Sequence, residues 1–287
     1  MDKIATPKRT KELISKYNFY FSKGLGQNFI IDQNILNKIT SAVKITKDTE
    51  VLEVGPGIGS LTQSLAEAAR RVVAVEIDQK LIPILKESLA DYENVEVINK
   101  DILKVDLHKL LEEKFEGKEI VVVGNLPYYI TTPIIMKFLE EKVPITAIVI
   151  MIQKEVADRM KAKAGTKDYG ALSIAVQYYC DIENVMIVPP SVFIPQPKVD
   201  SSVIRLQLLE EPRVKVKRED LFFKVVKDAF GKRRKTLLNA LSSGELGLSK
   251  ELVRRILESC GINEMRRGET LSIEEFANLS NLLAEEL

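Results

Sequence analysis

The sequence is poor in the residues that most enzymes use for acid–base, nucleophilic or metal chemistry. Among 287 residues it has one histidine, His108, and two cysteines, Cys180 and Cys260. Two cysteines exclude a disulfide framework, and with a single histidine they argue against a His/Cys metal site. His108 lies in a segment expected to form an amphipathic helix, where nothing nearby would orient it as a base, so we expect a structural role.

The sequence also lacks a long hydrophobic run. No apolar segment approaches the roughly 20 residues that a membrane-spanning helix needs, and the basic N-terminus lacks the apolar block of a secretory signal. With 45% hydrophobic and 29% charged residues, the composition is that of a soluble globular protein. We therefore expect a cytoplasmic protein without membrane contacts, long enough for one large domain and a small one.

The net charge of +1 hides two basic segments. Residues 1–23 carry six Lys or Arg against two acidic residues, and residues 213–235 carry ten against three. The rest of the chain is mildly acidic. A basic cluster is as typical of solvated surface as of nucleic-acid binding, so charge alone leaves both interpretations open.

From residue 49, short apolar segments alternate with amphipathic ones, which predicts a parallel sheet covered by helices on both faces. The predicted strands are residues 49–54, 71–76, 94–99, 118–124, 145–152, 184–188 and 202–208, and the predicted helices are 60–69, 79–90, 132–140, 154–161 and 171–180. Pro212 marks a boundary. Residues 1–211, with a basic N-terminal segment 1–28, are expected to form an α/β domain. Residues 212–287 are expected to form a small domain with helices near 218–230, 232–242, 249–259 and 272–285.

A glycine-rich loop, EVGPGIG at 53–59, joins the first predicted strand to a helix. Its glycines, among them Gly55 and Gly57, allow a tight turn and a close approach of a ligand to the backbone. Glu76 ends the second strand, where a carboxylate can accept hydrogen bonds from both hydroxyls of an adenosine ribose. Asp101 follows the third strand, where it could accept from an adenine amino group or simply cap a turn. The pattern predicts an adenosine-containing cofactor, and the lack of a third glycine at dinucleotide spacing disfavours a pyrophosphate.

A second loop, GNLPYY at 124–129, follows a buried predicted strand. An aromatic amine is a poor nucleophile because its lone pair is delocalised, so its methylation needs acceptors that hold the two N–H groups. The side-chain oxygen of Asn125 and the carbonyl of Leu126 can supply them. Pro127 rigidifies the turn, and Tyr128 offers a face on which a flipped base can stack. No general base is required, because the ammonium that forms loses its proton readily to solvent. The structural alternative is a surface turn with a core tyrosine.

The NLPY segment resembles the amino-methyltransferase signature Asn/Asp-Pro/Leu-Pro-Tyr, and the chain from about Ser22 onward resembles the bacterial small-subunit (16S) ribosomal RNA adenine N6,N6-dimethyltransferases. The matching blocks are GQNFI at 26–30, the Gly55 loop, VEID at 75–78, NLPYY at 125–129, QKEV at 153–156, VFIPQPKVDS at 192–201 and AFGKRRKTL at 229–237. Tyr129 is a variable position, at which some relatives carry Asn. The resemblance implies a Rossmann-like class I S-adenosylmethionine-dependent methyltransferase fold with a small α-helical C-terminal domain.

The resemblance also implies roles for single residues. With the glycine loop, it assigns a cofactor site to Asn28, Ile30, Gly55, Gly57, Glu76, Asp101 and Asn125. Asn28 and Ile30 would close over the methionine end of S-adenosylmethionine, and Asn125 would lie at the point of transfer. Phe193 would stack on the target base opposite Tyr128, although by itself it is more typical of a core aromatic.

The implied substrate is 16S rRNA in the small ribosomal subunit or its precursor, with two adjacent adenines near the 3′ end each dimethylated by a monomeric enzyme. Phosphate contacts are expected from Lys232, Arg233, Arg234 and Lys235, at the opening of a helix. Lys161, Lys163 and Lys167, in a Gly-containing loop, are further candidates.

Three alternatives stay open. The large-subunit rRNA adenine methyltransferases that confer macrolide resistance share fold and chemistry, but usually carry Asn-Ile-Pro and a different C-terminal block. A ribosome-assembly factor that acts mainly by docking would also have this surface, although an intact Asn125 and Tyr128 favour retained catalysis. A dehydrogenase would bind a nicotinamide cofactor, which we do not expect.

Overall fold

The computed structural model describes residues 3–117 and 119–287. The chain divides into two compact units, Met1–Ala157 with Ile182–Leu208 and Asp158–Asp181 with Leu209–Leu287. The chain passes from the first unit to the second after Leu208, close to the expected domain boundary after residue 211. However, residues 158–181, which the sequence placed in the first domain, group with the C-terminal helices. The reason is aromatic packing: α8 (Ala171–Tyr179) lies on α9 (Glu219–Gly231), where the ring of Tyr178 stacks on Phe222 with centroids 5.1 Å apart.

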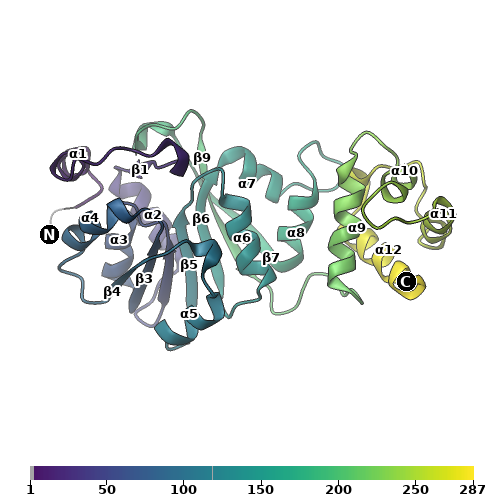
Figure 1. The fold of residues 1–287 in the computed structure, drawn as a ribbon, viewed down its shortest axis with the longest axis horizontal. Helices are drawn as coiled ribbons and strands as arrows, with labels where there is room; N and C mark the ends of the chain where they lie inside the picture. Colours follow the sequence, from purple (N-terminus) through teal and green to yellow (C-terminus); the bar gives the residue numbers. More distant parts are fainter. Residues whose placement is uncertain (1–2, 118) are drawn as a thin grey trace. The chain divides into compact units, whose positions relative to one another are not determined.

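The first unit is built on a seven-stranded sheet in the order β4-β3-β2-β5-β6-β9-β7 (Figure 1). The strands are β2 (Glu50–Val54), β3 (Arg71–Glu76), β4 (Val95–Asn99), β5 (Ile120–Asn125), β6 (Ala147–Gln153), β7 (Cys180–Val188) and β9 (Ser201–Leu208). The five strands from β4 to β6 are parallel, and β9 is antiparallel to β6. The α/β class with a mostly parallel sheet is thus confirmed. Lys118, the first residue of one predicted strand, lies outside the described residues.

The central strands are buried on both faces, which explains their continuous apolar runs. Val51, Val121 and Val149 belong to one core that includes α2 and α3, while their neighbours along each strand are buried toward the opposite face. The helices that cover the sheet are α2 (Gln33–Val43), α3 (Ser60–Ala68), α4 (Ile82–Ser88), α5 (Leu107–Lys114), α6 (Thr131–Glu140) and α7 (Lys154–Met160), the last of which continues into the second unit. His108, on α5, is exposed and its Nε2 lies 2.8 Å from the carbonyl of Glu141.

The basic N-terminal segment folds back onto its own unit. It forms α1 (Pro7–Lys16), for which the sequence analysis had predicted no element. Lys16 and Arg9 pair with Glu87 of α4 at 2.6 and 3.4 Å, and Lys3 pairs with Glu67 of α3 at 2.7 Å. Lys3, Arg9 and Lys16 are therefore engaged in intramolecular ion pairs.

The second unit is helical apart from the start of β7. Beside α8 and α9 it contains α10 (Leu237–Ser242), α11 (Lys250–Ser259) and α12 (Ile273–Glu286). The predicted helix 232–242 is wrong over its first five residues, because α9 runs to Gly231 and the chain then turns before α10, with the N–H of Lys235 donating to the carbonyl of Lys232 at 2.8 Å. Across the described residues, no helix is both long and apolar enough to cross a membrane.

Candidate active site

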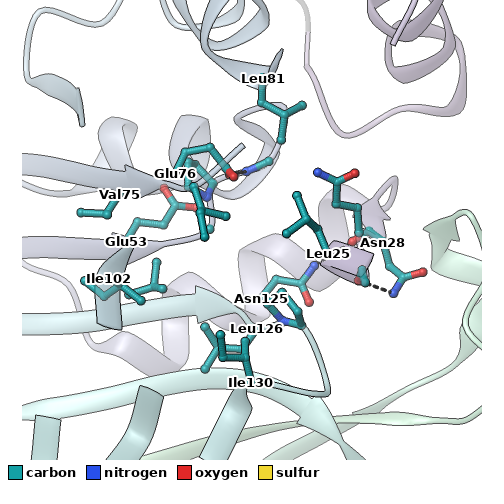
Figure 2. Close-up of a pocket in the computed structure, with 18 of the residues that line it drawn as sticks. Leu25, Asn28, Glu53, Val75, Glu76, Leu81, Ile102, Asn125, Leu126 and Ile130 are labelled. Carbon is teal, nitrogen blue, oxygen red and sulfur yellow. Dashed lines mark hydrogen bonds between the residues drawn. The ribbon is translucent and has the colours of Figure 1, made fainter. Parts of the chain in front are cut away.

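Three predicted site residues meet because of strand register. Val54 of β2 is paired with Val75 of β3 on one side and with Gly124 of β5 on the other. The next residue on each strand is therefore at the same rim of the sheet, and these residues are Gly55, Glu76 and Asn125. All three line one pocket, together with the segment Leu25–Ile30 that lies across it (Figure 2). This rim, at the carboxyl ends of parallel strands, is where open α/β sheets bind ligands.

The three glycines of the loop have a left-handed backbone, and at Gly57 a side chain would also be crowded. Gly57 has a φ of +62°, and a Cβ added there would lie 3.0 Å from the ring of Phe29. Phe29 belongs to β1 (Phe29–Ile30), and its ring packs with Phe19 and Phe21. The segment preceding β1 is thereby fixed against the loop.

Glu76 is 4% exposed and faces the same loop. Its Oε2 accepts a hydrogen bond from the N–H of Gly57 at 3.1 Å, and its Oε1 accepts from the N–H of Asp78 at 2.8 Å. Burial raises the pKa of Glu76 to about 7, against the opposing effect of these two hydrogen bonds. Each oxygen has a second lone pair, so the carboxylate can still accept from a ligand.

Asp101 caps a turn, which is one of the two roles considered for it, and it also lies in the pocket. Its Oδ1 caps the short helix that follows by accepting from the N–H of Leu103 at 3.0 Å, and the residue also lines the pocket. The apolar residues beside the two acidic ones had not been predicted as pocket residues. Ile77, which is 48% exposed, and Ile102 both line the pocket. The signal was present, since an isoleucine directly follows Glu76 and Asp101 at the ends of two neighbouring strands.

Glu53 also lines the pocket, and no role had been predicted for it. Its side chain is 1% exposed, and its Oε2 has no hydrogen-bond partner among the described residues. Burial raises the pKa of Glu53 to about 8, with a smaller contribution from the charge of Glu76. A buried carboxyl oxygen without a partner beneath a glycine loop fits a site that is completed by a polar ligand.

The orientation of the Asn125 amide is set from across the pocket. Its Nδ2 donates to the carbonyl of Asn28 at 2.8 Å, which leaves Oδ1 without a donor among the residues described. Asn28 in turn precedes β1, whose two residues pair with β8 (Phe193–Ile194). Asn28 and Ile30 thus line the same pocket as the glycine loop and the NLPY segment.

The NLPY segment leaves β5 as a tight, tethered loop. Leu126 is buried, and its N–H donates to the carbonyl of Met151 at 3.2 Å, whereas no described residue donates to its own carbonyl. The carbonyl of Pro127 accepts from the N–H of Ile130 at 3.1 Å. Tyr128 is half-buried, lines the pocket, and its hydroxyl lies 2.8 Å from Oγ of Ser201.

Two groups of predicted site residues lie elsewhere. Phe193 is 1% exposed, belongs to the core under the sheet and does not line the pocket. Lys232, Arg233, Arg234 and Lys235 are all exposed in the second unit, in the turn before α10. There the guanidinium of Arg233 donates to the carbonyl of Lys167, which brings together two basic segments far apart in sequence. Among the described residues there is no cluster of three His, Cys, Asp or Glu side chains that could hold a metal ion.

A parallel sheet with a glycine loop and an Asn-Leu-Pro-Tyr segment at one rim defines a Rossmann-like class I methyltransferase. The family model "Ribosomal RNA adenine dimethylase" matches residues 18–285, and the chain belongs to this family. It is 67% identical over 284 residues to ribosomal RNA small subunit methyltransferase A of Alkaliphilus metalliredigens (strain QYMF), with 99% of each chain covered. The predicted family is thereby confirmed.

Solved structures agree with the predicted fold. A dimethyladenosine transferase from Plasmodium falciparum is similar with a TM-score of 0.75 and 28% identity, covering 90% of this chain and 97% of that one. The 23S rRNA methyltransferase ErmE is similar with a TM-score of 0.66 and 27% identity, covering 89% and 99%. The second match explains why fold alone does not separate enzymes of the two ribosomal subunits.

Proposed function

We propose that the protein transfers methyl groups from S-adenosylmethionine to N6 of two adjacent adenines near the 3′ end of 16S rRNA, giving N6,N6-dimethyladenosine during small-subunit biogenesis. The observation that carries this proposal is the meeting of Asn125 with the glycine loop in one pocket, in a chain of the rRNA adenine dimethylase family. We further place the enzyme in the cytoplasm as a monomer.

The residues present fit an adenosine-containing cofactor. Gly55 leaves open space beside the backbone, since an added Cβ there would meet nothing within 4 Å, and Glu53 presents a buried oxygen without a partner among the described residues. Glu76 would hold the ribose hydroxyls, Asp101 the adenine amino group, and Ile77 and Ile102 would enclose the ring. Asn28 and Ile30 would close the methionine end above Gly55. When bound, S-adenosylmethionine supplies the transferable methyl group on a sulfonium centre.

The NLPY segment would act on the target adenine. The free Oδ1 of Asn125 and the free carbonyl of Leu126 would accept the two N–H groups of N6, which favours a pyramidal nitrogen with its lone pair available. Tyr128 would stack on the base, an interaction that is worth roughly 1–3 kcal/mol. The proton is lost to solvent after transfer, so the absence of histidine from this pocket is no obstacle.

The second unit would supply sequence-independent affinity for RNA. Lys232, Arg233, Arg234 and Lys235 form an exposed basic turn, and its contact with the 161–168 loop adds Lys163 and Lys167 to the same surface. Such a surface binds phosphates, while the fold of the RNA and the unstacked adenines supply selectivity.

The test is methyl transfer from labelled cofactor to unmethylated small subunits, with the modified nucleotides mapped by mass. We expect two adjacent dimethyladenosines near the 3′ end of 16S rRNA, and loss of most activity in Asn125→Ala. Asn37→Ala is the matched control, because Asn37 is exposed on α2 and bonds only locally to Gln33. Labelling of large-subunit RNA would instead favour the macrolide-resistance class, and no labelling would favour a docking factor.

A further inference from the structure

Tyr128 is held by a residue for which the proposed function gives no role. Its hydroxyl lies 2.8 Å from Oγ of Ser201, whose side chain is fully buried. The neighbouring Tyr129, in the same loop, is 59% exposed. Both adjacent tyrosines line the pocket, but only Tyr128 is half-buried with its hydroxyl tethered, so Tyr128 is the one with a fixed ring on which a base could stack.

The position of Ser201 is fixed by the sheet rather than by the loop. Ser201 is the first residue of β9 and pairs with Gln153 of β6, two residues after Met151, which pairs with Asn125. Asn125 and Ser201 are therefore held in register through a single strand, β6. The ring of Tyr128 is attached to this frame at both ends, through the backbone that follows Asn125 and through its hydroxyl.

We propose that Ser201 is a positioning residue, which sets the plane of the Tyr128 ring and thereby the place of the stacked adenine relative to Asn125. This inference rests on the proposed function. A tyrosine on a loop otherwise samples several rotamers, and each misplaced one moves N6 away from its acceptors. Because RNA affinity comes mainly from phosphate contacts, the loss should fall on kcat and leave KM for the RNA nearly unchanged.

The test is a double-mutant cycle with Tyr128→Phe, Ser201→Ala and the combined variant. Each single change removes the same hydrogen bond, so we expect kcat to fall about 3- to 10-fold in either, with no further fall in the double variant. Rates are normalised to the concentration of cofactor-binding sites, so a loss of folded protein does not count as a loss of kcat. Cofactor affinity should stay at the wild-type value.

Ser202→Ala is the matched control. Ser202 is also buried on β9, but its Oγ donates to Asn184 at 2.6 Å and does not contact Tyr128. Ser202→Ala should have a lower Tm than the wild type but the same kcat. When it is combined with Tyr128→Phe, the effects of the two changes on kcat should be independent. If Ser201→Ala fails to fold, Ser201→Cys keeps most of the volume with a weak hydrogen-bonding group and should give an intermediate kcat.

Three results would overturn the inference: wild-type kcat in Ser201→Ala, losses that multiply in the double variant, or an equal effect of Ser202→Ala. The cycle is run on whichever ribosomal RNA the wild-type enzyme methylates. Methylation of another site would therefore refute the proposed function, while the role of Ser201 would still be decided by the mutant cycle on that site. No methylation of any ribosomal RNA would refute both.

Discussion

Under the proposed function, the buried carboxylate of Glu76 should make cofactor binding dependent on pH. Glu76 is 4% exposed, and burial raises its pKa to about 7. Only the ionised form offers both oxygens as acceptors to the ribose hydroxyls, since the protonated form turns one of them into a donor. Between pH 8 and pH 6 the ionised fraction falls from about nine-tenths to about one-tenth, so the Kd of the cofactor should rise about tenfold.

The stability of the ligand-free protein should move in the opposite sense. The pKa of Glu76 is about 7 in the folded protein, against an ordinary value of 4.5, so the carboxyl binds its proton more tightly in the folded state. Its contribution is complete below pH 4.5 and is lost as the pH rises through 7, by on the order of 3 kcal/mol. The free protein therefore loses stability over the same pH interval in which its affinity for the cofactor increases.

Glu76→Gln separates this effect from others. The amide cannot ionise, so the cofactor Kd of this variant should be independent of pH. At pH 8 the variant should bind the cofactor about 10- to 150-fold more weakly than the wild type, because a charged acceptor is lost. Calorimetric titration with the cofactor from pH 5.5 to 8.5 measures both quantities. His108, the only histidine, is outside the pocket and cannot produce the slope by direct contact.

Glu53→Gln is the control for this titration. Burial raises the pKa of Glu53 to about 8, above the value of about 7 for Glu76, so Glu53→Gln should keep a midpoint near pH 7. A wild-type Kd that does not change with pH, or a Glu76→Gln variant that keeps the wild-type slope, would refute the reasoning.

Three other outcomes are expected. Gly57→Ala should lower the Tm and weaken cofactor binding, since the left-handed backbone costs about 1–2 kcal/mol and the new Cβ meets the Phe29 ring; binding at wild-type strength would contradict this. Phe193→Leu should lower the Tm with little change in kcat if the ring stays in the core, whereas a selective loss of kcat would indicate that it turns toward the base. Arg234→Ala should weaken RNA binding and reduce the slope of log affinity against log salt by about one; an unchanged slope would remove Arg234 from the RNA surface.

Much of the site was predictable because it follows from strand periodicity. Buried apolar runs located β2, β3 and β5, and in parallel strands the residues after such runs share one rim. Gly55, Glu76 and Asn125 could therefore be brought together from sequence, and the structure places them in one pocket. Ile77 could have been found by the same reasoning.

Features that depend on tertiary partners could not be predicted in this way. The N-terminal segment has a net positive charge in sequence, but that charge is partly compensated by Glu67 and Glu87, which lie far along the chain. Ser201 is similar: its pairing with Tyr128 requires the register of an antiparallel strand that returns to the sheet 73 residues later. Neither the ion pairs of the N-terminal segment nor the contact between Tyr128 and Ser201 can be predicted from composition or periodicity.

The contact between Asn125 and Asn28 joins the two halves of the pocket. The carbonyl of Asn28 accepts a hydrogen bond from Nδ2 of Asn125, which leaves Oδ1 of Asn125 to face the proposed target. The segment that precedes β1 and closes the proposed cofactor half of the pocket therefore also orients the Asn125 amide. β1 is itself held by two residues of β8 and by the Phe29 ring against Gly57. A displacement of β1 would free the Asn125 amide to rotate and would open the glycine loop at the same time. Under the proposed function, the acceptor geometry at N6 would therefore depend on the closed pocket and not on Asn125 alone.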